Sequence, residues 1–433
     1  MTRLLLQRFK HFIKTDIIRV FSFTALSTLV KMLTGFITIK VVALIIGPVG
    51  IALLGQLNNF SSIILTAASG GINNGITKYV SEHKESPDRV RLFISTALQI
   101  TIILSLVMGL VLIFFASYLS RLILLDSGYS YVFILFGFTL ILYTLNGYLM
   151  SVLNGFKEFK KFVRISIVTS IIGVFFTVGL VYFWELKGAL ISAVTYQSIA
   201  FFVTILMTIK SPWFVSKNFN VRFSKIVLKK YLSYSLMTIV SAATIPASQL
   251  FIRSHVIAQL SATEAGWWEG MNRISGMYLM VITSSFGVYY LPRLSEIKSK
   301  HELRKEIFTA YKIIIPILII SFIAIYAFRD LIIRILFTSD FYPMRNLFVW
   351  QLIGDLFKIS SWLLAFLMVA KSSTRLYIIT EILFSMLFVG LSVLFIQYYQ
   401  LVGITMAYMI MYFIYFIAML VIFKNLIFNR AIE

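Results

Sequence analysis

The sequence contains no cysteine, and histidine occurs only four times in 433 residues. The lack of cysteine excludes a disulfide framework, an iron–sulfur cluster and a thiolate metal site. The four histidines, His11, His83, His255 and His301, do not have the spacing of metal ligands. The sequence also lacks the G-x-x-x-x-G-K-[ST] loop that binds ATP phosphates, so we expect no metal, no cofactor and no ATPase site.

Charged residues are also scarce, at 13% of the chain, whereas about a quarter of the residues in soluble domains are charged. Hydrophobic residues make up 59%, and the mean hydropathy is +0.91. A soluble protein of this size could not keep so much apolar surface from water. The composition therefore excludes a soluble enzyme and a disordered chain, and it predicts an all-α integral membrane protein.

Apolar runs bounded by charge clusters predict about twelve transmembrane helices, since one span needs about 20 residues. Their expected limits are 20–45, 51–77, 92–116, 129–151, 165–184, 188–209, 232–257, 264–291, 307–327, 343–370, 376–397 and 401–423. With both termini in the cytoplasm, 28 of the 39 Lys and Arg lie in inside segments and five in outside loops. The positive-inside rule therefore favours this orientation. The net charge of +22 then reflects topology and contact with membrane lipid, and we expect no nucleic acid partner.

Residues 210–231, the longest inside connection, separate six predicted spans from six. We expect a cytoplasmic amphipathic lead-in (1–19), an N-terminal bundle (20–209), this linker, a C-terminal bundle (232–423) and a cytoplasmic tail (424–433). Gly50 and Gly266 each open a span after a turn, and Ser81-Glu82 and Ser295-Glu296 end the two segments. This echo favours two six-helix bundles related by a pseudo-twofold axis along the membrane normal.

Ionisable residues inside the spans are the candidate functional residues, because each costs roughly 2.5–3.5 kcal/mol at a span centre. The cations proposed for substrate binding are Lys31, Lys40, Arg253, Arg273 and Lys358. Asp355, Glu381 and Glu269 are candidates for ion coupling or charge pairing. The summed charge is positive, which suits an anionic cargo, and phosphate is the natural partner of Arg and Lys.

These charges also have structural interpretations. Glu269 and Arg273 (i,i+4) and Asp355 and Lys358 (i,i+3) have the spacing of internal ion pairs, and Arg253 could extend to the outer surface. Glu381 is either a helix-end charge or a pore residue, and Lys40 lies near the outer end of its span. Gly35, between Lys31 and Lys40, and Pro246 are candidate hinges. The amides Asn73 and Asn74 are candidates for binding sugar hydroxyls.

Several segments resemble a known family. Ala25-Leu-Ser-Thr-Leu-Val-Lys31 opens the first span, Gly47-Pro-Val-Gly50 forms a turn, and Asn74-Gly-Ile-Thr-Lys-Tyr-Val80 closes the second span. Leu291-Pro-Arg-Leu-Ser295 closes the eighth, and Trp350-Gln-Leu-Ile-Gly-Asp-Leu-Phe-Lys358 lies in the tenth, followed by Ala370-Lys371 and Glu381. In this order they resemble the Wzx-type flippases, which include O-antigen and common-antigen translocases. These belong to the polysaccharide transporter family of the multidrug/oligosaccharidyl-lipid/polysaccharide exporter superfamily.

The resemblance implies a bacterial inner-membrane carrier without enzymatic activity. It would move undecaprenyl-diphosphate-linked oligosaccharide from the cytoplasmic to the periplasmic leaflet by alternating access, with a polymerase and chain-length proteins of the same pathway as further partners. Lys31, Lys40, Asp355 and Lys358 fall on matching motif positions. Two alternatives stay open: a drug or cation antiporter of the same superfamily, which the positive charge disfavours, and a membrane oligosaccharide polymerase, which the short outer loops disfavour.

Overall fold

The structure is a computed structural model that describes residues 16–285, 290–371 and 373–427. These residues form helices and short 3-10 turns, with no strand among them. The elements are α2 (Asp16–Ala68), α3 (Asn73–Glu82), α4 (Pro87–Phe114), α5 (Ala116–Leu124), η1 (Ser127–Tyr129), α6 (Ser130–Gly155), α7 (Phe159–Thr208), η2 (Ser216–Asn218), α8 (Lys225–Gln259), α9 (Ala262–Ser285), α10 (Leu291–Glu296), α11 (Lys300–Ala327), α12 (Arg329–Leu336), η4 (Ser339–Leu347), α13 (Phe348–Ala370), α14 (Thr374–Ile422) and α15 (Lys424–Ile427).

Seven helices among the described residues are long and apolar enough to cross a membrane. Three of them contain one residue with a non-helical backbone and so consist of two segments: Gly47 divides α2, Glu185 divides α7 and Gln400 divides α14. Together with the long helices α8 and α9, the described residues hold twelve long helical segments. The all-α membrane fold is confirmed, and the segments are consistent with the twelve predicted spans.

Contacts within the chain define two units. Unit 1 comprises the described residues up to Thr38 together with Ile64–Ile239, and unit 2 comprises Ile39–Ile63 together with the described residues from Val240 onward. The predicted N-terminal bundle includes residues 39–63, whereas in the structure these residues pack with unit 2. For example, Gln56 Nε2 donates to Ser254 Oγ at 2.8 Å. Most of the predicted lead-in and the end of the predicted tail lie outside the described residues.

The second half of the chain repeats the order of elements of the first half. The helices α4 and α11 are both 28 residues long, and each is followed by a short helix, α5 or α12. The divided helices α7 and α14 have 50 and 49 residues. Gln400 lies 215 residues after Glu185, an offset close to that between Gly50 and Gly266. The repeat suggested by two glycines therefore extends along the chain.

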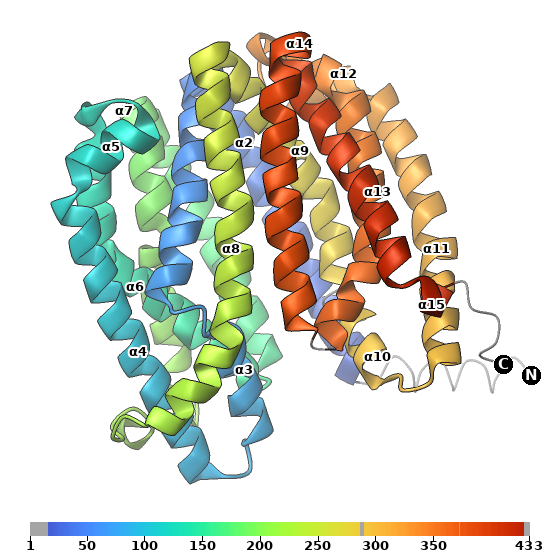
Figure 1. The fold of residues 1–433 in the computed structure, drawn as a ribbon. Coiled ribbons are helices and arrows are strands. Elements are labelled where there is room, and N and C mark those ends of the chain that lie inside the picture. The colour runs from blue at the N-terminus through green and yellow to red at the C-terminus, as the bar shows by residue number, and fades with distance from the viewer. Residues whose placement is uncertain (1–15, 286–289, 372, 428–433) are drawn as a thin grey trace, which may run out of the picture. The chain divides into compact units, whose positions relative to one another are not determined.

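Each unit has its own packed helices. In unit 1, α6 packs against both α4 and α7, as the ribbon in Figure 1 shows, and an apolar core includes Tyr79 and Phe93, whose rings stack at 4.7 Å. In unit 2, α13 packs against α14, and the two helices are drawn in orange to red in Figure 1. These helix pairs bury the apolar faces that the period of 3.6 residues predicts.

Two local predictions differ from the structure. The predicted span 51–77 ends early, because Gly70 and Gly71 adopt left-handed backbone conformations (φ 63° and 62°) that end α2 and let α3 begin at Asn73. The connection between the predicted spans 307–327 and 343–370 is not an irregular loop, because it forms α12 and the start of η4. Phe337 and Phe341 of this segment are buried and pack ring to ring at 4.7 Å, so apolar burial overrides its charges.

Candidate functional site

Arg253 on α8 is fully buried in unit 2 and lies at the centre of a polar cluster. Its Nη2 donates to Glu269 Oε2 on α9 at 2.5 Å, and its Nη1 donates to Gln56 Oε1 at 3.4 Å. The guanidinium also lies 5.3 Å from the ring centroid of Trp268. Arg273 Nε donates to the other oxygen of Glu269 at 3.0 Å. One carboxylate thus holds two guanidinium groups, and the cluster has an excess of one positive charge.

The backbone of unit 2 makes room for this cluster. A short connection joins α8, which ends at Gln259, to α9, which begins at Ala262, and it brings Arg253 level with Glu269 across the hairpin. A Cβ on Gly55 would lie 2.6 Å from the carboxyl carbon of Glu269, so only glycine fits there without displacing the acid. The i,i+4 spacing predicted the Glu269–Arg273 pair, whereas the partnership of Arg253 depends on the fold.

Lys40 contacts the end of α12 in unit 2. Its ammonium donates to the backbone oxygens of Phe337 at 2.6 Å and Arg334 at 3.0 Å. The last carbonyls of a helix have no intrahelical partner and carry partial negative charge. Lys40 therefore caps α12, a contact across almost 300 residues that no local pattern indicates.

Asp355 on α13 is fully buried and accepts hydrogen bonds from four side chains. The donors are Ser275 Oγ at 2.7 Å, Tyr278 OH, Gln351 Nε2 at 3.4 Å and, on α14, Tyr408 OH at 2.7 Å. A buried carboxylate is stabilised when its lone pairs are satisfied in this way. Asp355 therefore connects α9, α13 and α14, and no cation of the described residues forms an ion pair with it.

Lys358, one helical turn after Asp355, is surrounded by aromatic rings. Its Nζ donates to Tyr408 OH at 3.1 Å and lies 5.0, 5.3 and 5.6 Å from the ring centroids of Trp362, Tyr412 and Tyr408. Among the described residues, Lys358 and Asp355 form no ion pair; Tyr408 connects them instead. The i,i+3 spacing therefore does not give the direct pair that it allows, because the cation–π contacts hold the ammonium elsewhere.

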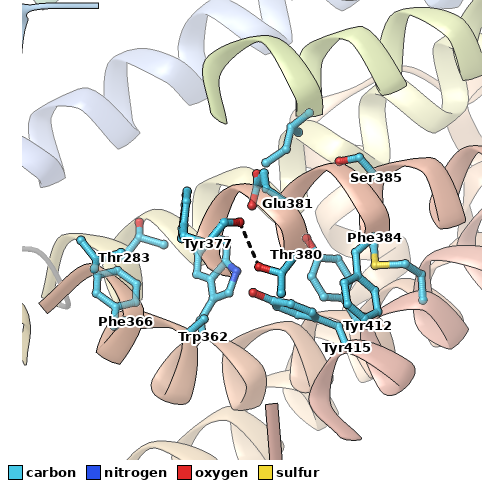
Figure 2. A pocket seen from close by; sticks show the side chains of 14 residues that line it. Thr283, Trp362, Phe366, Tyr377, Thr380, Glu381, Phe384, Ser385, Tyr412 and Tyr415 are labelled. Carbon is cyan, nitrogen blue, oxygen red and sulfur yellow. Dashed lines mark hydrogen bonds between the residues drawn. The ribbon is translucent and has the colours of Figure 1, made fainter. Parts of the chain in front are cut away.

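Glu381 on α14 lines a cavity of about 350 Å³ in unit 2. Figure 2 shows this carboxylate across the cavity from Trp362, with Tyr412 and Tyr415 near Thr380. Glu381 forms no ion pair or hydrogen bond with any residue in the described part of the chain. The remaining lining residues are Ile245, Thr283, Ala365, Phe366, Val369, Tyr377, Phe384, Ser385 and Met411.

The other candidates lie apart from these clusters. Lys31 is an exposed side chain on α2 in unit 1, and it forms no ion pair with a described residue. Asn73 has a buried Oδ1 without a hydrogen-bond partner among the described residues, whereas Asn74 is exposed. Gly35 and Pro246 lie within continuous helix, since the non-helical residue inside α2 is Gly47. Hinge motion at either position stays a prediction.

The sequence interpretation missed Tyr408, Trp362 and Tyr412. The sequence does contain two stripes with the i, i+3, i+4, i+7 spacing of one helix face. One consists of Trp362, Ala365, Phe366 and Val369, and the other of Tyr377, Thr380, Glu381 and Phe384. Such stripes occur in most membrane helices, and only the packing shows that these two face one cavity. In the described residues no group of three or more acidic or histidine side chains could hold a metal ion.

The fold is shared with several transporters of known structure. The inward closed lipid II flippase MurJ matches with a TM-score of 0.71 at 15% identity, covering 94% of this chain and 87% of that chain. The inward-facing form of a multidrug resistance MATE family transporter of the MOP superfamily matches with a TM-score of 0.66 at 17% identity, covering 95% and 99%. At these identities the likeness establishes the fold alone.

The sequence itself has similar relatives. The lipid III flippase of Escherichia coli (strain K12) is 28% identical over 393 residues, which are 91% of this chain and 94% of that protein. The lipid III flippase of Shigella flexneri matches to the same extent. The family described as polysaccharide biosynthesis protein matches residues 17–298, well over half of the sequence. This chain therefore belongs to the polysaccharide biosynthesis protein family, and it has the fold of the MOP superfamily transporters.

Proposed function

We propose that this protein is a flippase for a lipid-linked oligosaccharide. The observation that carries the proposal is the family membership together with an alignment to lipid III flippases over nearly the whole of both chains. The fold of MurJ and of the MATE transporters supports transport by alternating access. The substrate is an undecaprenyl-diphosphate-linked oligosaccharide, with its diphosphate bound by cations and its sugars by amides and aromatic rings.

The charges of the described residues suggest which cations contact the diphosphate. Lys31 in unit 1 is exposed and has no described ion partner. In unit 2, Arg273 is 18% exposed whereas Arg253 is fully buried, and both share Glu269. The surplus positive charge of this cluster is therefore most accessible at Arg273. In unit 1, we assign contact with the diphosphate to Lys31 and contacts with sugar hydroxyls to Asn73 and Asn74. In unit 2, we assign contact with the diphosphate to Arg273 and a supporting position to Arg253.

The membrane potential can drive this movement. A diphosphate carries about two negative charges, and the cytoplasm is negative relative to the outside. Moving both charges across the whole field is favourable by about 4.6 kcal/mol per 100 mV. The proposed location is the bacterial inner membrane with both termini in the cytoplasm, where Lys and Arg are concentrated. The headgroup then moves from the cytoplasmic to the periplasmic leaflet, where a polymerase and its chain-length partner would receive it.

The test is leaflet-resolved transport in proteoliposomes. The purified full-length chain is reconstituted with a fluorescent polyprenyl-diphosphate oligosaccharide, and a membrane-impermeant quencher reports the outer-leaflet fraction. Lys31→Gln should slow movement by at least roughly tenfold, whereas Lys31→Arg should retain most of it, because the charge is kept. Lys312→Gln is the matched control, since Lys312 is an exposed lysine on α11.

Wild-type protein that moves no lipid-linked sugar would overturn the flippase proposal. If the same vesicles exchange an organic cation against protons, the antiporter alternative is favoured. If they lengthen the sugar chain, a polymerase is favoured. Normal transport by a well-expressed Lys31→Gln variant would remove Lys31 from the mechanism and leave the function intact.

A further inference from the structure

The aromatic cavity of unit 2 has the size and form of a small-molecule site. Its volume of about 350 Å³ lies within the roughly 300–1,000 Å³ range of ligand pockets. One face of α13 supplies Trp362, the first segment of α14 supplies Glu381, and the second segment supplies Tyr412 and Tyr415. Figure 2 shows these side chains of the consecutive helices α13 and α14 lying around one space. The cavity thus combines ring faces with a carboxylate.

Glu381 has unused hydrogen-bonding capacity in this cavity. The carboxylate is half-buried, and no described residue donates to it or forms an ion pair with it. An ionised carboxylate accepts hydrogen bonds only, and partly burying it without donors is costly. Thr380 does not supply the missing donor, because its hydroxyl already bonds the backbone oxygens of Tyr377 and Leu376. The cavity therefore presents a carboxylate with free acceptor capacity, which a donor group of a ligand can fill in place of water.

The charge balance restricts the kind of ligand. Lys358 is not one of the residues that line the cavity, but its ammonium makes cation–π contacts with the lining rings of Trp362 and Tyr412. Its single positive charge is shared by the two carboxylates of Asp355 and Glu381, so the neighbourhood as a whole carries one excess negative charge. An organic cation would compete with Lys358 for the same rings, and an anion would be repelled by Glu381. An acyl chain would leave the carboxylate without a donor.

We propose that this cavity is a subsite for one uncharged sugar ring of the lipid-linked oligosaccharide. A sugar offers an apolar C–H face, which packs against Trp362 or Tyr412, together with hydroxyl or amide N–H groups, which donate to Glu381. The subsite is separate from the cations assigned to the diphosphate. The inference rests on the proposed function and adds the residues that select the sugar.

Binding of free sugars tests the subsite without transport. The full-length chain in nanodiscs is titrated with methyl glycosides of neutral hexoses and N-acetylhexosamines, and saturation-transfer NMR reports contact. Glu381→Gln should lower the affinity for the tightest-binding glycoside by roughly tenfold, and Trp362→Leu should lower it to a similar extent. The controls are Glu85→Gln, an exposed carboxylate, and Trp184→Leu, an exposed indole of unit 1, and both should bind like the wild type. If Glu381→Gln binds the glycosides as well as the wild type does, the subsite is overturned. It is also overturned if Glu381→Gln loses only the binding of tetraphenylphosphonium, an organic cation, and keeps the binding of the glycosides.

A transport measurement distinguishes two outcomes: failure of the sugar subsite and failure of the proposed flippase function. Two lipids are compared in proteoliposomes: polyprenyl diphosphate carrying the oligosaccharide, and polyprenyl diphosphate without sugar. Glu381→Gln should slow the first and leave the second unchanged. Equal slowing of both lipids would overturn the subsite and leave the flippase proposal standing. If the wild type moves neither lipid yet binds glycosides through Glu381, the flippase proposal fails and the sugar site stands.

Discussion

The helices α7 in unit 1 and α14 in unit 2 are 50 and 49 residues long, and each is divided by a single non-glycine residue of positive φ. Three residues after the division, Gly188 and Gly403 each lie against a backbone oxygen of the preceding segment. The two helices are therefore built on the same backbone plan, at equivalent places in the internal repeat.

Their polar contacts differ in kind. In unit 1, Asn146 on α6 donates to Gln197 on α7 at 3.1 Å and accepts from Thr204 at 2.6 Å, so neutral groups connect the helices. In unit 2, the connection between α13 and α14 runs through Asp355 and Tyr408 beside Lys358. Because the same frame is built with neutral contacts in unit 1, the ionised groups of unit 2 are not a requirement of the fold. This is the physical reason to look for function there.

The largest expected effect comes from breaking the buried ion cluster of unit 2. Glu269→Gln should lower the free energy of unfolding by about 3–5 kcal/mol, because it leaves the fully buried Arg253 without its counter-ion. Arg273→Gln should lower the free energy of unfolding by about 1 kcal/mol or less, because Arg273 is partly exposed and the ion pair between Glu269 and Arg253 remains. Thermal unfolding in detergent micelles measures both. Equal losses would mean that Arg253 is stabilised by groups other than Glu269.

The next effect tests whether α7 and α14 are truly equivalent. A Cβ at Gly188 would lie 1.9 Å from Leu180 O, and one at Gly403 would lie 2.3 Å from Phe395 O. Alanine at either position should cost about 1–3 kcal/mol or more, because backbone must move. Gly179→Ala and Gly390→Ala are matched controls in the same helices, where a Cβ meets nothing within 4 Å, and both should be neutral or slightly stabilising. A large loss in only one helix would break the equivalence.

A smaller difference is expected between the two polar connections. Asp355→Asn keeps the shape of the side chain, but its NH2 group then faces hydroxyl groups that donate to the carboxylate in the wild type. We therefore expect the free energy of unfolding to fall by about 2–3 kcal/mol. Asn146→Ala removes two neutral hydrogen bonds and should cost about 1–2 kcal/mol. Unfolding midpoints of the two variants, measured side by side, give the comparison. A greater loss for Asn146→Ala would show that the neutral network is the stronger connection.

The smallest effect concerns the ends of the short helices α5 and α12. Leu125, which ends α5, has a left-handed backbone (φ 60°), whereas the end of α12 is capped by Lys40. Leu125→Gly should therefore raise the stability by up to about 1 kcal/mol, since glycine relieves the strain. Lys40→Met should lower the stability by about 0.3–1 kcal/mol through loss of the charge at the helix end. Changes of the opposite sign would contradict the assignment of these two helix ends.

Sequence alone determined the class of the molecule. Composition and the length of apolar runs predict a multi-pass helical membrane protein, because no soluble packing could bury so much apolar side chain. Local spacing also predicted the Glu269–Arg273 pair, since neighbours one turn apart meet on any helix. The glycines at 50 and 266 indicated the internal repeat.

Only the tertiary structure decided which distant groups meet. Three sets of contacts join residues that no helical period relates: Arg253 with Glu269, Lys40 with the end of α12, and Lys358 with Tyr408 and Tyr412. Helical periodicity reports the face on which a residue lies but not the helix that packs against that face. The packing of residues 39–63 with unit 2, and with it the partners of the buried charges, follows from contacts across long stretches of chain.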